Sequence, residues 1–182
     1  ETPEVPGRGL AGITQARPTK PLIAAVEGYA LAGGLELALA CDLIVAGQSA
    51  VLGLPEVRRA LVAAAGGVLL LPQRVPMNVA MQMILTGDPI DAARAFEIGL
   101  VNKVVDDDRV LDEAVDLARR IAGNGPLAVA ASKRLAHAGR EWSESERWVR
   151  QQPEIASVFA SADAREGALA FAEKRPPKWI GT

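Results

Sequence analysis

Lys20-Pro-Leu-Ile-Ala-Ala-Val-Glu-Gly-Tyr-Ala-Leu-Ala-Gly-Gly-Leu-Glu-Leu-Ala-Leu-Ala-Cys-Asp42 is the stretch that decides the fold of this chain. The apolar run 22–26 is typical of a buried strand, and residues 27–32 break the pattern. Gly33-Gly34 then opens the run 35–40, whose Leu and Ala residues are strong helix formers. A strand, a tight turn and a helix that begins at two glycines leave unpaired backbone N–H groups directed at one point. The stretch therefore predicts a place where an anion, or an oxygen that becomes anionic, can bind.

A carboxyl group lies close to that point in the sequence. Glu36 follows Gly33 by three residues, so we expect it about one turn along the same helix. A Glu in a first helical turn is also a favourable partner of the helix dipole, and a Gly-Gly pair also permits close packing. Taken alone, this stretch leaves the structural and the chemical interpretation open.

The composition limits the class of protein. With 182 residues, 49% of them apolar and 4% aromatic, the chain can form one aliphatic, Ala-rich core. The net charge is −2 and no basic run stands out, which disfavours nucleic acid and anionic membrane surfaces as partners. No apolar run reaches transmembrane length. The single cysteine, Cys41, excludes an intrachain disulfide and favours a buried, inert thiol in a reducing compartment, so we expect a cytoplasmic protein.

Short strands and Gly-rich turns occupy the first third of the chain, and helices occupy the rest. Residues 1–19 form a connector with room for a short helix around 10–15, residues 43–46 a second buried strand, and Pro55 places Glu56 at the start of a new segment. The other expected elements are a helix over 68–71, a helix over 76–86, a helix over 92–98 capped by Asp91, a strand over 100–105, helices over 111–121 and 126–139, a helix that starts with the Ser143–Glu146 capping box and is kinked or divided at Pro153, and a helix over 164–174 capped by Asp163.

Six pieces of the sequence resemble the enoyl-CoA hydratase/isomerase superfamily, the crotonases, and they stand in the family's order. The resemblance covers the chain from about residue 17 onward and is greatest to an enoyl-CoA hydratase that lacks its N-terminal segment. The pieces are Pro21-Leu-Ile-Ala-Ala-Val-Glu-Gly-Tyr-Ala-Leu-Ala-Gly-Gly-Leu-Glu-Leu-Ala, Cys41-Asp-Leu-Ile-Val-Ala, Gly53-Leu-Pro-Glu-Val, Leu85-Thr-Gly, Ala95-Phe-Glu-Ile-Gly-Leu-Val-Asn-Lys-Val and Glu166-Gly-Ala-Leu-Ala-Phe-Ala-Glu-Lys-Arg.

The resemblance implies an α/β fold. Residues 1–125 would form the C-terminal part of a crotonase-like spiral of ββα units, and residues 126–182 a helical trimerisation region. It implies acyl-CoA thioester substrates, no separate cofactor because coenzyme A is part of the substrate, no metal, and a homotrimer or homohexamer. In the family, a segment before residue 1 supplies a second oxyanion N–H and much of the CoA-binding wall. Either a longer polypeptide carries that segment, or the family's full site is not built.

The resemblance also assigns roles to individual residues. The Gly33 N–H would stabilise the thioester enolate, and Glu36 and Glu56 would be the two hydratase glutamates. Phe171 and Lys174 would reach the CoA of an adjacent subunit, with the ring near the adenine and the ammonium near the phosphates. Elementary chemistry agrees, because adding water to an enoyl thioester builds charge on the carbonyl oxygen and requires a base and an acid.

Three kinds of function stay open at this point. Two glutamates favour hydration of a trans-2-enoyl-CoA to a 3-hydroxyacyl-CoA over isomerisation or other crotonase chemistry, and they argue against a non-catalytic acyl-CoA-binding protein. Ala32 replaces the first glycine of a common family Gly-Gly-Gly, with little expected effect. The run 57–67 departs from the family pattern near the acyl pocket. Fatty, amino-acid-derived and sterol side-chain thioesters therefore all stay open as substrates.

Overall fold

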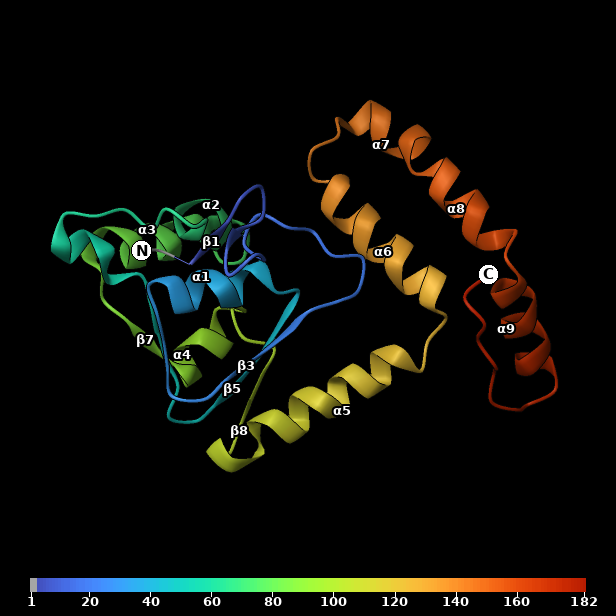
Figure 1. The fold of residues 1–182 in the computed structure, drawn as a ribbon, viewed down its shortest axis with the longest axis horizontal. Helices are drawn as coiled ribbons and strands as arrows, with labels where there is room; N and C mark the ends of the chain where they lie inside the picture. The colour runs from blue at the N-terminus through green and yellow to red at the C-terminus, as the bar shows by residue number, and fades with distance from the viewer. Residues whose placement is uncertain (1–2) are drawn as a thin grey trace. The chain divides into compact units, whose positions relative to one another are not determined.

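The computed structural model in Figure 1 describes residues 3–182, which form two compact units. The first unit contains residues 3–18 and 22–117, and the second contains residues 19–21 and 118–182. The boundary falls inside a continuous helix, α5 (Val110–Ala122). The division of the sequence into domains of residues 1–125 and 126–182 stays a prediction.

The strands of the first unit are short and mostly parallel. Apolar runs with both faces covered suit parallel pairing, and the run predicted over 22–26 is indeed a strand. One sheet contains β3 (Ile23–Val26), β5 (Leu43–Gly47) and β8 (Lys103–Val105), all parallel and in the order β3-β5-β8; a second contains β4 (Tyr29–Leu31), β6 (Val51–Gly53) and β7 (Ile90–Asp91) in the order β4-β6-β7, with the β6–β7 pair antiparallel; β1 (Glu4–Val5) and β2 (Gly9–Leu10) form an antiparallel pair.

Capping residues and glycines set the ends of helices in the first unit. Gly87 takes a left-handed conformation with φ 68° and ends the helix before it, and the Asp91 carboxylate accepts a hydrogen bond from Arg94 N at 2.7 Å. The helical segments are α1 (Gly33–Ala40), η1 (Pro55–Arg59), α2 (Gly67–Leu70), η2 (Leu71–Gln73), α3 (Met77–Thr86), α4 (Ala92–Glu97) and η3 (Asp107–Arg109), followed by α5.

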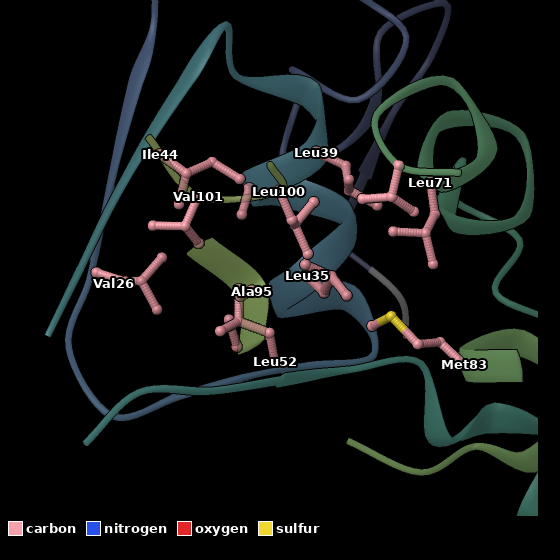
Figure 2. Close-up of a cluster of buried hydrophobic side chains, with 14 of the residues drawn as sticks. Val26, Leu35, Leu39, Ile44, Leu52, Leu71, Met83, Ala95, Leu100 and Val101 are labelled. Atoms are coloured by element: carbon pink, nitrogen blue, oxygen red, sulfur yellow. The ribbon is translucent and has the colours of Figure 1, made fainter. Parts of the chain in front are cut away.

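The core of the first unit surrounds α1. Leu35 and Leu39 from this helix lie among side chains of β5, β6, α4 and η2 (Figure 2). Successive side chains of a strand point to opposite faces, and β5 uses both. Ile44 belongs to the cluster around α1, whereas Val45 packs with Val110 from α5. The central strand is therefore buried on both sides.

The second unit is helical. It contains α6 (Pro126–Ala138), α7 (Glu144–Arg150), α8 (Gln152–Phe159) and α9 (Ala162–Ala172). The predicted capping box is present, with Ser143 N donating to the Glu146 carboxylate at 3.3 Å. Pro153 lies in the first turn of α8, and the chain divides into two helices just before it, as its sequence predicts.

Two local predictions are wrong. The short helix around 10–15 does not form, because Leu10 ends β2 and positive φ angles at Gly9, Ala11 and Gly12 turn the chain instead. Asp163 does not cap the last helix. Ser161 is the N-cap and accepts from Ala164 N at 3.0 Å, while the buried Asp163 carboxylate accepts from Ile180 N and Gly181 N of the C-terminal tail at 2.8 and 3.0 Å.

The cluster around α1 predicts a large effect of core truncation. Ile44→Ala removes a fully buried side chain, and we expect it to lower the free energy of unfolding by about 2–5 kcal/mol. Leu111→Ala is the matched control, since that side chain is 60% exposed, and its effect should stay within about 0.5 kcal/mol. Urea unfolding of the intact protein measures both. Equal effects would contradict the burial of Ile44.

Candidate active site

The parallel pairing of β4 and β6 brings two predicted site segments to one edge of a sheet. Leu31 pairs with Gly53 at the last step of the ladder, and Ala32 N then donates to the Gly53 carbonyl at 3.0 Å. One strand continues into α1 at Gly33, and the other continues into η1, which contains Glu56. Because both strands run in the same direction, the two helical segments start at the same edge.

The entry into α1 is strained. Ala32 has φ 51° and ψ −124°, a conformation that L-residues rarely adopt and that costs about 1–3 kcal/mol. Its carbonyl accepts from Glu36 N at 3.0 Å, which closes the first helical turn. No side chain among the described residues caps this helix start. The first N–H groups of α1, Gly33 included, therefore remain able to donate to a ligand oxygen.

Glu36 is a buried carboxylate inside the apolar core. Its side chain is 4% exposed, and its Oε1 accepts a hydrogen bond from Gly67 N at 2.9 Å. Gly67 begins α2 and cannot be replaced without a shift, because an added Cβ would lie 2.8 Å from the Ala63 Cβ and 3.0 Å from the Leu54 Cδ2. A hydrogen bond to a backbone N–H offsets part of the cost of burying the charge.

Glu56 lies in a different environment. Its Oε2 is buried and has no hydrogen-bond partner within the described part of the chain. Burial raises the pKa of the Glu56 carboxyl, its own backbone N–H lowers it less, and the charge of Glu36 raises it further. The charge of Glu36 therefore acts on the Glu56 carboxyl, which holds its proton more tightly than an exposed Glu does. This combination suits a pair that divides acid and base roles.

A cleft lies along the same helix. It has a volume of about 260 Å³ and is lined by α1 and by the β3–β4 region, with Tyr29, Gly34 and Leu37 among its residues. Neither Glu36 nor Glu56 lines this cleft. The convergence of both carboxyls and the Gly33 N–H on one pocket stays a prediction.

Phe171 and Lys174, the other predicted site residues, lie in the second unit. Phe171 is 88% exposed near the end of α9, and Lys174 follows the helix with φ 55°. Lys174 N donates to the Phe171 carbonyl at 3.2 Å, so these two residues are neighbours. The structure thus groups Gly33, Glu36 and Glu56 in one unit, and Phe171 with Lys174 in the other.

Sequence reasoning missed two groups that contact α1. Gly67 donates to Glu36, and Arg74 donates to the carbonyls at the end of the helix. For Gly67 a signal existed, because Gly66-Gly67 precedes a short helix just as Gly33-Gly34 does, and a helix start directs N–H groups at a nearby acceptor. For Arg74 the sequence offers no local signal.

Comparison with known proteins decides the family. Residues 12–182 match the family model described as Enoyl-CoA hydratase/isomerase. The chain belongs to this family. An enoyl-CoA hydratase structure from Mycobacterium tuberculosis H37Rv is 55% identical with a TM-score of 0.96, covering 98% of this chain and 71% of that one. One from Mycobacterium marinum is 54% identical with the same score and coverage. Carnitinyl-CoA dehydratase of Proteus mirabilis is 43% identical over 178 residues, 95% of this chain and 68% of the relative.

These matches confirm the predicted family and the mixed α/β crotonase fold with a helical C-terminal region. The relatives are named hydratases and dehydratases of CoA esters, which supports chemistry of that type in the family. Over residues 3–182, no helix is both long and apolar enough to cross a membrane. Nor do the described residues bring together three or more His, Cys, Asp or Glu side chains that could hold a metal ion.

The buried Glu56 carboxyl predicts a pH-dependent loss of stability. Its folded-state pKa is raised above the usual 4.5, so the folded protein binds this proton more tightly than the unfolded chain does. The contribution of Glu56 to the free energy of unfolding is then highest below the usual pKa and falls as the pH rises through the raised pKa. We expect Glu56→Gln to be more stable than the wild type at pH 8, with the difference shrinking toward pH 4.

Urea unfolding at several pH values measures this difference. Glu97→Gln is the control for loss of a negative charge, because Glu97 is an exposed side chain that pairs with Arg94 on α4. A Glu56→Gln variant whose stability relative to the wild type does not change with pH would show that the carboxyl is not held in a protonation-favouring site.

Proposed function

We propose that the intact protein is a lyase that adds water across the double bond of a trans-2-enoyl-CoA to give a 3-hydroxyacyl-CoA. One observation carries the proposal: Glu56 has a buried carboxyl oxygen without a hydrogen-bond partner among the described residues and a raised pKa, and it interacts electrostatically with a second carboxyl, Glu36. Isomerisation needs only one group that moves a proton, whereas addition of water uses a base for the water and an acid for Cα.

The environments suggest how the two glutamates divide these roles. Glu36, held by Gly67 N–H, takes a proton from the water whose oxygen attacks Cβ. Glu56, the carboxyl with the raised pKa, gives a proton to Cα. The electron pair of the double bond passes through the thioester enolate, whose oxygen accepts a hydrogen bond from Gly33 N–H. Proton transfer from Glu36 to Glu56 restores the starting state.

The substrate is an acyl-CoA thioester, and coenzyme A enters as part of it, so no separate cofactor is required. The carnitinyl-CoA dehydratase relatives favour a second candidate of the same chemistry, reversible loss of water from a short, polar 3-hydroxyacyl-CoA. A cytoplasmic location stays a prediction that rests on the single cysteine of the sequence.

Replacing either glutamate by its amide tests the proposal. Glu36→Gln and Glu56→Gln keep the side-chain size but remove the acid–base function, so we expect kcat to fall by about 10²–10⁴-fold with little loss of CoA-ester binding. Loss of enoyl-thioester absorbance measures turnover with crotonyl-CoA and a longer enoyl-CoA, and a gain of this absorbance measures dehydration of carnitinyl-CoA. The control Glu97→Gln should behave as the wild type.

Each alternative function gives a different outcome. Migration of the double bond without water addition would identify an isomerase. Binding of CoA esters by a wild type that turns over none of them would identify a non-catalytic binding protein. Near-normal turnover of one Gln variant would assign a structural role to that glutamate.

We also propose that the protein assembles as a homotrimer or homohexamer through its second unit. That unit leaves large apolar side chains in water, although burying each would contribute about 1.5–3 kcal/mol. They are Trp148, Val149, Phe159, Leu169, Phe171 and Ile180, between 50% and 88% exposed. Polar groups on α9 and just after it, among them Glu166 and Arg175, suit the rim of such an interface.

Sedimentation of the intact protein tests the assembly. The variant Lys174→Ala tests whether the Lys174 ammonium lies near the phosphates of a CoA bound to an adjacent subunit, as the family resemblance implies. We expect a trimer or hexamer that dissociates when the chain is cut after Ala162. We expect Lys174→Ala to weaken CoA-ester binding, because a lysine ammonium is a point-charge partner for phosphate, while the control Lys178→Ala should bind normally. A monomeric intact protein would contradict the assembly, and equal affinities of both lysine variants would remove Lys174 from the site.

A further inference from the structure

The helix that contains Gly33 and Glu36 is short and has no cation of its own at its C-terminal end. α1 comprises eight residues, and no basic residue lies in its last turn. The last carbonyls of any helix lack partners within that helix, and positive charge there is favourable. Something outside α1 must therefore fix its C-terminal end.

Arg74, just beyond η2, supplies that contact. Its Nη1 donates to the Asp42 carbonyl at 3.0 Å, and its Nη2 donates to the Leu39 carbonyl at 3.0 Å and to the Cys41 carbonyl. The guanidinium is partly buried. A planar, permanently charged fork can bond several carbonyls at once in a fixed geometry, which a lysine ammonium cannot reproduce.

The segment that ends in Arg74 also contacts Glu36. Residue 67 opens this segment, and its N–H donates to Glu36 Oε1 at 2.9 Å. The segment 67–74 is therefore bonded to α1 at two places, once at the candidate catalytic carboxyl and once at the end of the helix. The Asp42 carboxylate in turn accepts from Leu22 N at 2.7 Å, which connects the same helix end to the chain just before β3.

From this arrangement we propose that Arg74 is a positioning residue for the reaction. By fixing the C-terminal end of α1 against the segment 67–74, it keeps the Glu36 carboxylate within reach of Gly67 N–H and holds the start of the helix at its place beside η1. The proposal rests on the proposed hydratase function, because it assigns Glu36 a catalytic role. Arg74 donates to backbone carbonyls at the end of α1 and just beyond it, and it acts on the reaction through Glu36.

Arg74→Met and Arg74→Lys in the intact protein test this. We expect Arg74→Met to lower kcat by about 10- to 100-fold with KM little changed, since small misplacements of a catalytic group have effects of that size. Arg74→Lys keeps the positive charge but lacks the planar guanidinium, so its kcat should lie between those of the wild type and Arg74→Met. Arg94→Met is the matched control, because the Arg94 side chain forms an ion pair with the exposed Glu97. This variant should keep the wild-type kcat.

Hydrogen exchange at the Gly67 amide provides a readout that does not depend on activity. We expect this amide to exchange faster in both Arg74 variants, while core amides such as that of Ile44 keep their protection. Wild-type exchange at Gly67, or a kcat equal to that of Arg94→Met, would overturn the proposal. If Arg74→Met does not fold, Arg74→Lys decides by the same two measurements. A wild type that turns over no enoyl-CoA would defeat the hydratase function instead, and exchange at Gly67 would still decide whether Arg74 positions Glu36.

Discussion

The parallel pairing of β4 with β6 is the constraint on which the candidate site depends. The hydrogen bond from Ala32 N to the Gly53 carbonyl extends this pairing one step beyond the strands. Because the strands end together, α1 and η1 begin at one edge of the sheet. The backbone hydrogen bonds between these strands therefore determine that Gly33 and Glu56 both follow the same edge of the sheet.

The same region contains features that lower stability. Glu36 lies between Leu35 and Leu39, which are both buried, and a carboxylate is tolerated there only with a hydrogen-bond donor such as Gly67 N–H. Ala32 has a strained backbone, and Glu56 holds a buried oxygen without a partner among the described residues. Strain and buried charge concentrated in one place, inside a well-packed aliphatic core, are typical of a functional site rather than of a packing defect.

The sequence predicted those parts of the fold that depend on neighbouring residues. The strand before Gly28, the helix from Gly33 and the capping box at Ser143 all follow from local patterns. The bond between Glu36 and Gly67 joins residues 31 positions apart, and only the folded chain brings them together. Asp163 shows the same limit, because its carboxylate accepts from the C-terminal tail, which is distant in sequence, while Ser161 caps α9.

The sequence cannot predict which glutamate acts as the base and which as the acid, because the two side chains are chemically identical. The Glu36 carboxylate accepts a backbone N–H, whereas Glu56 has a buried oxygen that no group in residues 3–182 contacts by a hydrogen bond, so only their surroundings differ. Hydration and dehydration are the same reaction in opposite directions, and each transition state is shared. A pair such as Glu36 and Glu56 therefore suits relatives named for either direction. The difference between such relatives is then expected where the acyl group is bound. The run 57–67, which follows Glu56 and reaches the first residue of α2, departs from the family pattern near the acyl pocket that the resemblance implies.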